Sequence, residues 1–203
     1  MFIVILAVLM GLLPLNSMAE TILVFGDSIS AGYGVEVQQG WVALLQKKLA
    51  GQYNGVVIKN ESISGETTAG GLARIDQALS RHKPDIVLLE LGANDGLRGL
   101  SPQEMHNNLK EMALRSQKAG AKVLLLAMKI PPNYGTRYIE MFYNVYPQLA
   151  KELKIPYVPS LLEEVALKPD MMQADGLHPN ALAQPVIAEK IGSYLSPLLS
   201  GGS

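Results

Sequence analysis

The sequence predicts a single α/β domain in which a parallel five-stranded sheet carries helices on both faces. Short apolar runs alternate with longer amphipathic stretches along the chain, a rhythm typical of successive β-α-β units. Several of the short runs are apolar throughout, as strands buried on both faces should be. The 203 residues, 48% of them apolar and 17% charged, are enough for one ordinary core and too apolar for a disordered chain.

Five short segments rich in aliphatic and β-branched residues are expected to form the strands. In chain order they are Ile22–Phe25, Val56–Lys59, Ile86–Leu91, Val123–Ala127 and Pro156–Val158. The stretches between them have helical periodicity and are expected to form helices near Trp41–Ala50, Gly71–Arg81, Pro102–Ala119 and Arg137–Leu153. A last helix is expected within Asn180–Leu195, and Pro185 favours a start at that proline.

The beginning of the chain is predicted to be a signal peptide covering residues 1–19, followed by one folded domain covering residues 20–198. Phe2–Leu15 is an almost unbroken apolar stretch, and Ser17–Ala19 offers the small residues that a signal peptidase recognises. No Lys or Arg precedes the stretch, so the start codon could lie upstream, and a retained membrane anchor is the minor alternative. We therefore expect a periplasmic or secreted protein with no stable membrane insertion after cleavage.

The charge balance and the missing cysteines exclude several classes of function. A net charge of −1 gives no electrostatic reason to expect nucleic acid as a partner. The absence of cysteine excludes disulfides, thiolate metal sites and a cysteine nucleophile. His82 and His106 fall in predicted helices without the spacing of metal ligands, so a metal site is not expected.

Polar motifs follow the first three predicted strands. Gly26-Asp27-Ser28 follows the first strand, a loop that contains Gly65 follows the second, and Gly92-Ala93-Asn94-Asp95-Gly96 follows the third. The carboxyl ends of parallel strands share one edge of the sheet, where open α/β sheets bind ligands. Near the chain end, Asp175-Gly176-Leu177-His178 adds a carboxylate and an imidazole. We expect these four motifs to converge.

Together these residue types have the chemistry of a serine hydrolase. Ser28 would attack a carbonyl, His178 would accept the proton, and Asp175 would fix the imidazole tautomer. The candidate oxyanion donors are the backbone N–H of Ser28, the N–H of Gly65 and the side-chain amide of Asn94. Each motif alone could be an ordinary turn, since Asp, Asn, Ser and Gly are turn residues. Their combination favours catalysis.

The four motifs occur in the order of the sequence blocks of the SGNH (GDSL) hydrolases, which the mature chain resembles over essentially its whole length. Longer runs resemble the bacterial multifunctional thioesterase I/protease I/lysophospholipase group, which includes periplasmic arylesterases. These runs are Ser62–Thr67, Asn94–Gly99, Pro132–Gly135 and Asp175–Pro179. The resemblance implies a flavodoxin-like three-layer α/β/α sandwich with strand order 2-1-3-4-5, no cofactor, and hydrolysis of acyl esters and thioesters.

The resemblance also implies a catalytic set in which this sequence shows no departure from the family. That set is Ser28, Gly65, Asn94, Asp175 and His178. Leu97, in an apolar stretch after the third motif, and Tyr134, in the loop after the fourth strand, are the candidate substrate contacts. The expected partner is a small-molecule or lipid acyl ester or thioester, and the expected state is a monomer.

The leading hypothesis is an exported esterase or thioesterase that acts on medium-chain or aryl acyl groups, with lysophospholipase activity as a further possibility. A carbohydrate O-deacetylase on the same fold is an alternative, and it predicts a shallow polar site. A catalytically inactive ligand-binding module is a second alternative, because one fold hosts many functions. Such a module would have no need of Asp175 and His178 together.

Overall fold

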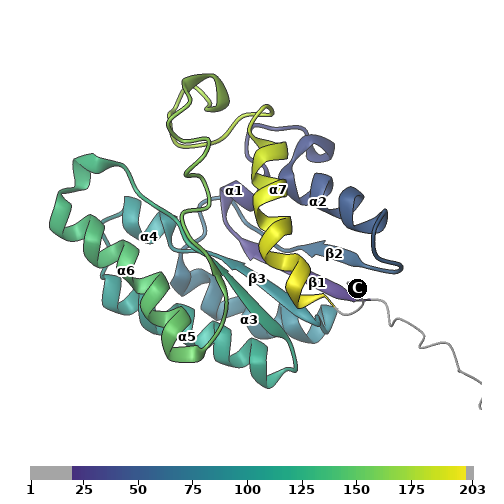
Figure 1. Cartoon of the computed structure of the whole chain (residues 1–203). Coiled ribbons are helices and arrows are strands. Elements are labelled where there is room, and N and C mark those ends of the chain that lie inside the picture. Colours follow the sequence, from purple (N-terminus) through teal and green to yellow (C-terminus); the bar gives the residue numbers. More distant parts are fainter. Residues whose placement is uncertain (1–19, 200–203) are drawn as a thin grey trace, which may run out of the picture.

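A computed structural model describes residues 20–199, which form a five-stranded parallel sheet between two layers of helices (Figure 1). The predicted signal peptide, residues 1–19, lies outside the described residues. The strands are β1 (Thr21–Gly26), β2 (Val57–Asn60), β3 (Ile86–Glu90), β4 (Lys122–Leu126) and β5 (Tyr157–Val158). They pair in the order β2-β1-β3-β4-β5, and every pair is parallel. The predicted α/β sandwich and its strand order are confirmed.

Five longer helices make up the outer layers. They are α2 (Trp41–Ala50), α3 (Thr68–His82), α5 (Pro102–Lys118), α6 (Thr136–Leu153) and α7 (Gln184–Leu195). On one face of the sheet α3 packs against α5 and α5 against α6, while α2 and α7 pack together on the other face (Figure 1). Among residues 20–199, no helix has both the length and the hydropathy that crossing a bilayer requires.

The core lies along the two faces of the sheet. All residues of β3 are buried, as are all residues of β1 after Thr21. The helices close over them with fully buried side chains such as Leu45, Ile75, Leu109 and Ile187. Each buried aliphatic side chain of this size stabilises the fold by about 1.5–3 kcal/mol. The uniformly apolar strand segments therefore belong to a sheet covered on both faces.

The helix ends follow local capping chemistry. The hydroxyl of Ser101 accepts the N–H of Glu104 at 3.3 Å at the start of α5. Helix α3 begins at Thr68, three residues earlier than predicted, because the Thr67 side chain accepts the N–H of Gly70. Helix α7 begins at Gln184, so its proline lies in the first turn, where a missing N–H costs nothing.

Two one-turn helices and several 3₁₀ turns were not predicted. The helices are α1 (Ser28–Ala31) and α4 (Ala93–Leu97), and both start where a central strand ends. The 3₁₀ turns are Val37–Gln39, Pro132–Tyr134, Pro169–Met171 and Ser196–Leu198. Segments of three to five residues are too short to show a helical period. The two short helices matter because they carry Ser28 and Asn94.

Candidate active site

The turn after β1 presents Ser28 at the carboxyl edge of the sheet. Asp27 caps the one-turn helix α1, its buried carboxylate accepting the N–H of Ile29 at 3.0 Å. Ser28 is the first residue of that helix. Its Oγ lies 2.9 Å from Nε2 of His178, although the two residues are far apart in the chain. This is the nucleophile-to-base distance that an activated serine needs.

On its other side the imidazole is held by Asp175. Nδ1 of His178 lies 2.7 Å from Oδ2 of Asp175, while Oδ1 accepts the N–H groups of Leu177 and His178. A carboxylate accepts only, so Nδ1 is the protonated nitrogen and Nε2 presents its lone pair to Ser28. The hydrogen bond from His178, followed by the two backbone N–H groups, lowers the pKa of Asp175 to about 2.

The segment that carries the imidazole is fastened to the rest of the domain by two side-chain amides. Gln173 Nε2 donates to the carbonyls of Tyr33 and Pro179, at 2.7 and 3.1 Å. The buried Gln184 donates from Nε2 to the carbonyls of Pro179 and Asn180. The ring of Tyr33 also lies against the imidazole of His178, with centroids 4.6 Å apart. Together these contacts fix the position of the imidazole of His178.

Asn94 lies in α4, directly after β3, with its side chain beside the turn that holds Ser28. Nδ2 of Asn94 donates to Oδ2 of Asp27 at 3.1 Å. The next residue, Asp95, points away from the site and accepts both the N–H and the hydroxyl of Thr68, at 2.8 and 2.5 Å. These two neighbouring residues therefore differ in role. Asp95 stabilises the start of α3, whereas Asn94 lines the cavity beside Ser28.

Gly65 lies in the loop between β2 and α3 with φ +79°, a conformation that glycine adopts without strain. Its carbonyl accepts Nη2 of Arg98, at the end of α4, at 2.8 Å. The same loop is joined to β1, because the N–H of Ile63 donates to the carbonyl of Gly26 at 3.0 Å. Gly65 thus lies at the same edge of the sheet, fastened to the elements that carry Asn94 and Ser28.

A cavity of about 220 Å³ opens at this edge, and Ser28, Asn94 and His178 line it. Its apolar lining consists of Ile29, Ala93, Leu97, Met128, Ile130, Pro131, Leu162 and Leu177. Leu97 is thus a lining residue, whereas Tyr134 lies outside the cavity lining and donates its hydroxyl to the Leu97 carbonyl at 2.8 Å. The lining residues after β4 and β5 were missed, although their position at strand ends was a usable signal.

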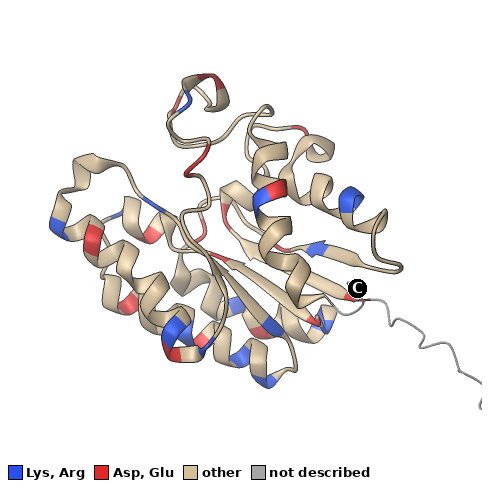
Figure 2. Cartoon of the chain, in the orientation of Figure 1, with Lys and Arg blue, Asp and Glu red and all other residues tan. Residues whose placement is uncertain are grey.

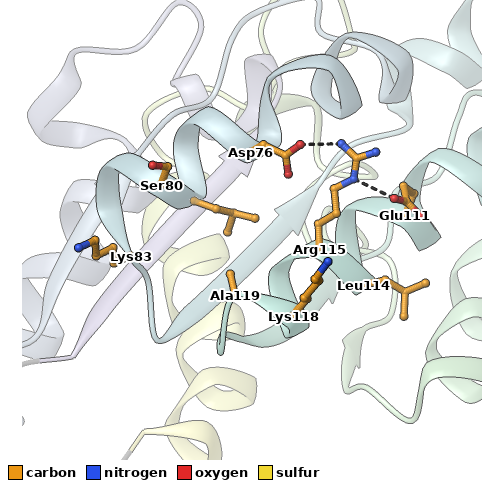
Figure 3. A pocket seen from close by; sticks show the side chains of 9 residues that line it. Asp76, Ser80, Lys83, Glu111, Leu114, Arg115, Lys118 and Ala119 are labelled. Carbon is orange, nitrogen blue, oxygen red and sulfur yellow. Dashed lines mark hydrogen bonds and ion pairs between the residues drawn. The ribbon is translucent and has the colours of Figure 1, made fainter.

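A larger groove, of about 710 Å³, lies elsewhere, between the second halves of α3 and α5 (Figure 3). Within it Arg115 pairs with both Asp76 and Glu111, each at 2.8 Å. Charges of both signs are interspersed along these helices (Figure 2), so they offset one another locally. Because α3 runs away from the carboxyl edge, this groove lies near the opposite edge. The smaller cavity is the one that contains a paired hydroxyl and imidazole.

Across residues 20–199, no group of three His, Asp or Glu side chains is arranged to hold a metal ion. The two other histidines are paired with carboxylates. His82 lies 2.5 Å from Glu61, and His106 lies 3.2 Å from Glu152. The chemistry that the site residues offer on their own is nucleophilic attack assisted by a base and by hydrogen-bond donors.

Comparison with known proteins places this geometry in a family. Residues 24–184 match the model of the GDSL-like Lipase/Acylhydrolase family. The chain is 51% identical over 188 residues to esterase TesA of Pseudomonas aeruginosa, covering 93% of this chain and 94% of that protein. It is 46% identical over 185 residues to thioesterase 1/protease 1/lysophospholipase L1 of Escherichia coli K12, covering 91% and 88% of the two chains.

Comparison with solved structures indicates the same family as the sequence relatives do. A crystal structure of TesA superposes with a TM-score of 0.86 at 52% identity and covers 89% of this chain and 100% of that one. The psychrotrophic esterase EstA from Pseudoalteromonas, inhibited by monoethylphosphonate, superposes with a TM-score of 0.85 at 42% identity, covering 89% and 98%. The chain therefore belongs to the GDSL-like lipase/acylhydrolase family, and it is an enzyme that hydrolyses acyl esters.

Proposed function

We propose that Ser28 is the nucleophile of this enzyme, with His178 as its general base and Asp175 as the residue that orients the base. The observation that carries the proposal is the unbroken hydrogen-bond chain from hydroxyl to imidazole to carboxylate, with heavy-atom distances of 2.9 and 2.7 Å. A serine hydroxyl attacks poorly until a base takes its proton. These two hydrogen bonds supply both the base and the imidazole tautomer that can accept the hydroxyl proton.

The reaction runs through an acyl-enzyme. As Ser28 Oγ bonds to the acyl carbon, Nε2 of His178 takes its proton, and Asp175 stabilises the resulting imidazolium. When the tetrahedral intermediate collapses, His178 returns that proton to the departing alcohol or thiol. Water then attacks the acyl-enzyme with His178 again acting as base, which releases the carboxylic acid and restores Ser28.

The negative oxygen of the intermediate is stabilised by donors already in place. The Asn94 amide has two hydrogens, and because one is donated to Asp27, the other is available to the oxyanion. The backbone N–H of Ser28 lies in the first turn of α1, where N–H groups have no intrahelical acceptor. The N–H of Gly65 is the third proposed donor, on the loop fastened to both neighbouring elements.

The proposed substrates are esters and thioesters of apolar acyl groups, including aryl esters and lysophospholipids. Two features support this range. The cavity beside Ser28 is lined mainly by aliphatic side chains, among them Leu97 and Ile130, which suit an acyl chain better than a sugar. The relatives are named as an esterase, an arylesterase and a thioesterase/lysophospholipase. Leu97 is assigned to contact with the acyl chain. Tyr134 holds Leu97 in place by donating its hydroxyl to the Leu97 carbonyl.

The test compares Ser28→Ala with Ser80→Ala, a matched exposed serine that lines the groove of Figure 3. Hydrolysis is measured on p-nitrophenyl esters of graded chain length and on acyl-CoA thioesters. Ser28→Ala should abolish turnover on both series, and Ser80→Ala should leave it unchanged. Wild-type turnover in Ser28→Ala would reject the nucleophile. A preference for acetate, with release of acetate from acetylated sugars, would favour the deacetylase alternative.

We assign residues 1–19 to a signal peptide, residues 20–198 to the catalytic domain, and the mature enzyme to the periplasm or the exterior as a monomer. The apolar stretch and the small residues before Glu20 support export. Intact-mass measurement of the exported protein should give a chain that begins at Glu20. A full-length chain recovered from the membrane fraction would instead indicate a retained anchor. Light scattering should give the mass of one chain.

A further inference from the structure

Glu90 is a buried carboxyl group that the mechanism above does not use. It is the last residue of β3, has no exposed surface, and pairs in register with Gly26, the last residue of β1. A Cβ atom at Gly26 would lie 2.6 Å from Oε2 of Glu90. The glutamate side chain therefore lies across the strand end from which the nucleophile turn begins.

One oxygen of this carboxyl group joins both sides of that turn. Oε2 of Glu90 accepts the N–H of Asp27 at 3.2 Å and the hydroxyl of Ser30 at 2.7 Å. Ser28 lies between these two residues in the sequence. The residues on either side of the proposed nucleophile, Asp27 through its N–H and Ser30 through its hydroxyl, are thus hydrogen-bonded to a single buried atom, which fixes the start of α1 relative to the sheet.

The surroundings of the second oxygen, Oε1, indicate whether Glu90 is charged or neutral. Oε1 of Glu90 is buried and makes no hydrogen bond within the described part of the chain, a costly arrangement for a carboxylate and a milder one for a neutral carboxyl. Burial, together with the neighbouring Asp27, raises the pKa of Glu90 well above its ordinary value. Both observations favour a neutral Glu90.

Asp27 is equally buried, but it has more partners that favour a negative charge. Burial raises the pKa of Asp27 to about 6, but the N–H of Ile29, the nearby His178 and the amide of Asn94 all favour its ionised form. Tyr146 from α6 adds a buried neutral hydroxyl to this cluster, and Asp95 from α4 also acts electrostatically on that hydroxyl. The one proton that the two carboxyls retain near neutral pH therefore belongs on Glu90.

We infer that Glu90 is a positioning residue whose neutral carboxyl holds the turn around Ser28 and leaves Asp27 ionised. The ionised Asp27 then accepts from Asn94 and turns the other hydrogen of the amide toward the oxyanion. The inference rests on the proposed roles of Ser28 and Asn94. Glu90 touches no reacting atom and acts through these residues.

The experiment compares Glu90→Gln, Glu90→Ala and the matched control Ser116→Ala, a buried serine of α5 that also loses one hydrogen bond. Steady-state hydrolysis of p-nitrophenyl butyrate is measured across the pH range over which all variants remain folded. A glutamine side chain is uncharged and has nearly the shape of a protonated glutamate. Glu90→Gln should therefore retain kcat within about threefold near neutral pH. Glu90→Ala should lose about tenfold or more in kcat with KM nearly unchanged, because ground-state binding is intact.

The pH profile separates positioning from simple loss of packing. In the wild type, rising pH removes the proton from Glu90, whereas glutamine stays neutral, so the ratio of kcat in Glu90→Gln to kcat in the wild type should rise with pH. Ser116→Ala should show a flat ratio. A kcat in Glu90→Gln as low as in Glu90→Ala, or a flat ratio in Glu90→Gln, would overturn the inference. If Glu90→Ala does not fold, the Glu90→Gln ratio decides alone. Turnover surviving in Ser28→Ala would instead reject the proposed function.

Discussion

Asparagine in place of Asp175 should lower kcat about a thousandfold and leave KM nearly unchanged, since the carboxylate acts on the imidazolium that forms in the transition state. Oδ2 of Asp175 lies 2.7 Å from Nδ1 of His178. At that separation two unit charges attract by about 1.5 kcal/mol in bulk water and about 6 kcal/mol at the effective dielectric of a protein surface. The side chains are 40% and 21% exposed, which places the loss midway, near 4 kcal/mol.

The assay is steady-state hydrolysis of a p-nitrophenyl ester, with Asp170→Asn as control. Asp170 is an exposed aspartate in the same segment, and its backbone carbonyl accepts Nδ2 of Asn180. This control should behave as the wild type. A kcat for Asp175→Asn within about threefold of the wild type would refute the assignment of Asp175 as the orienting residue.

The same substitution has a pH-dependent effect on stability. The pKa of Asp175 is lowered from 3.8 to about 2 in the folded chain, so its stabilisation is complete above about pH 4 and is lost as pH falls toward 2. The full shift corresponds to about 2.5 kcal/mol, which solvent screening of this half-exposed pair reduces to about 1 kcal/mol. Urea titrations of Asp175→Asn should show that deficit at neutral pH and none near pH 2.

Four further outcomes are expected. Asn94→Ala should lower kcat by two to three powers of ten in ester hydrolysis, at nearly constant KM. Tyr33→Leu should lower kcat about fivefold by exposing the imidazolium of His178, and Tyr33→Phe should restore it. Gly26→Ala should cost about 1–3 kcal/mol in urea unfolding, since the new Cβ meets Oε2 of Glu90. Because the raised pKa of Glu90 makes the folded chain retain a proton that the unfolded chain releases, Glu90→Gln should gain stability over the wild type as pH rises above 4.5.

Much of the fold could be predicted from local pattern. Largely apolar runs such as Ile86–Leu91 indicate strands buried on both faces, and the cap at Ser101 with Pro102 after it marks a helix start on chemical grounds alone. Strand order is different, because it depends on how distant segments pack. That part of the prediction came from the resemblance to a family, and no pattern of hydropathy contains it.

Site residues could be predicted where their own chemistry is distinctive. They were missed where their role depends on how distant segments of the chain pack together. Ser28 and His178 stand in motifs with few alternative explanations. Glu90 does not, since a glutamate near the end of an apolar run resembles an ordinary solvent-exposed strand end. Its burial arises from the register that places it beside Gly26, a residue distant in the chain. The aliphatic lining after β4 and β5 was also missed, although its position at the ends of two strands was a usable signal.

The two glutamine amides that fasten the His178 segment also determine how the enzyme should lose activity. Residues 166–178 contain no buried residue, and in Figure 1 this olive-coloured segment projects beyond the sheet. Such a segment opens at a lower free energy than the core strands. On warming, the base should therefore detach from Ser28 while the sheet is still intact, and cooling should restore it without refolding. Thermal inactivation and thermal unfolding should thus be separate events in this enzyme, with inactivation at the lower temperature.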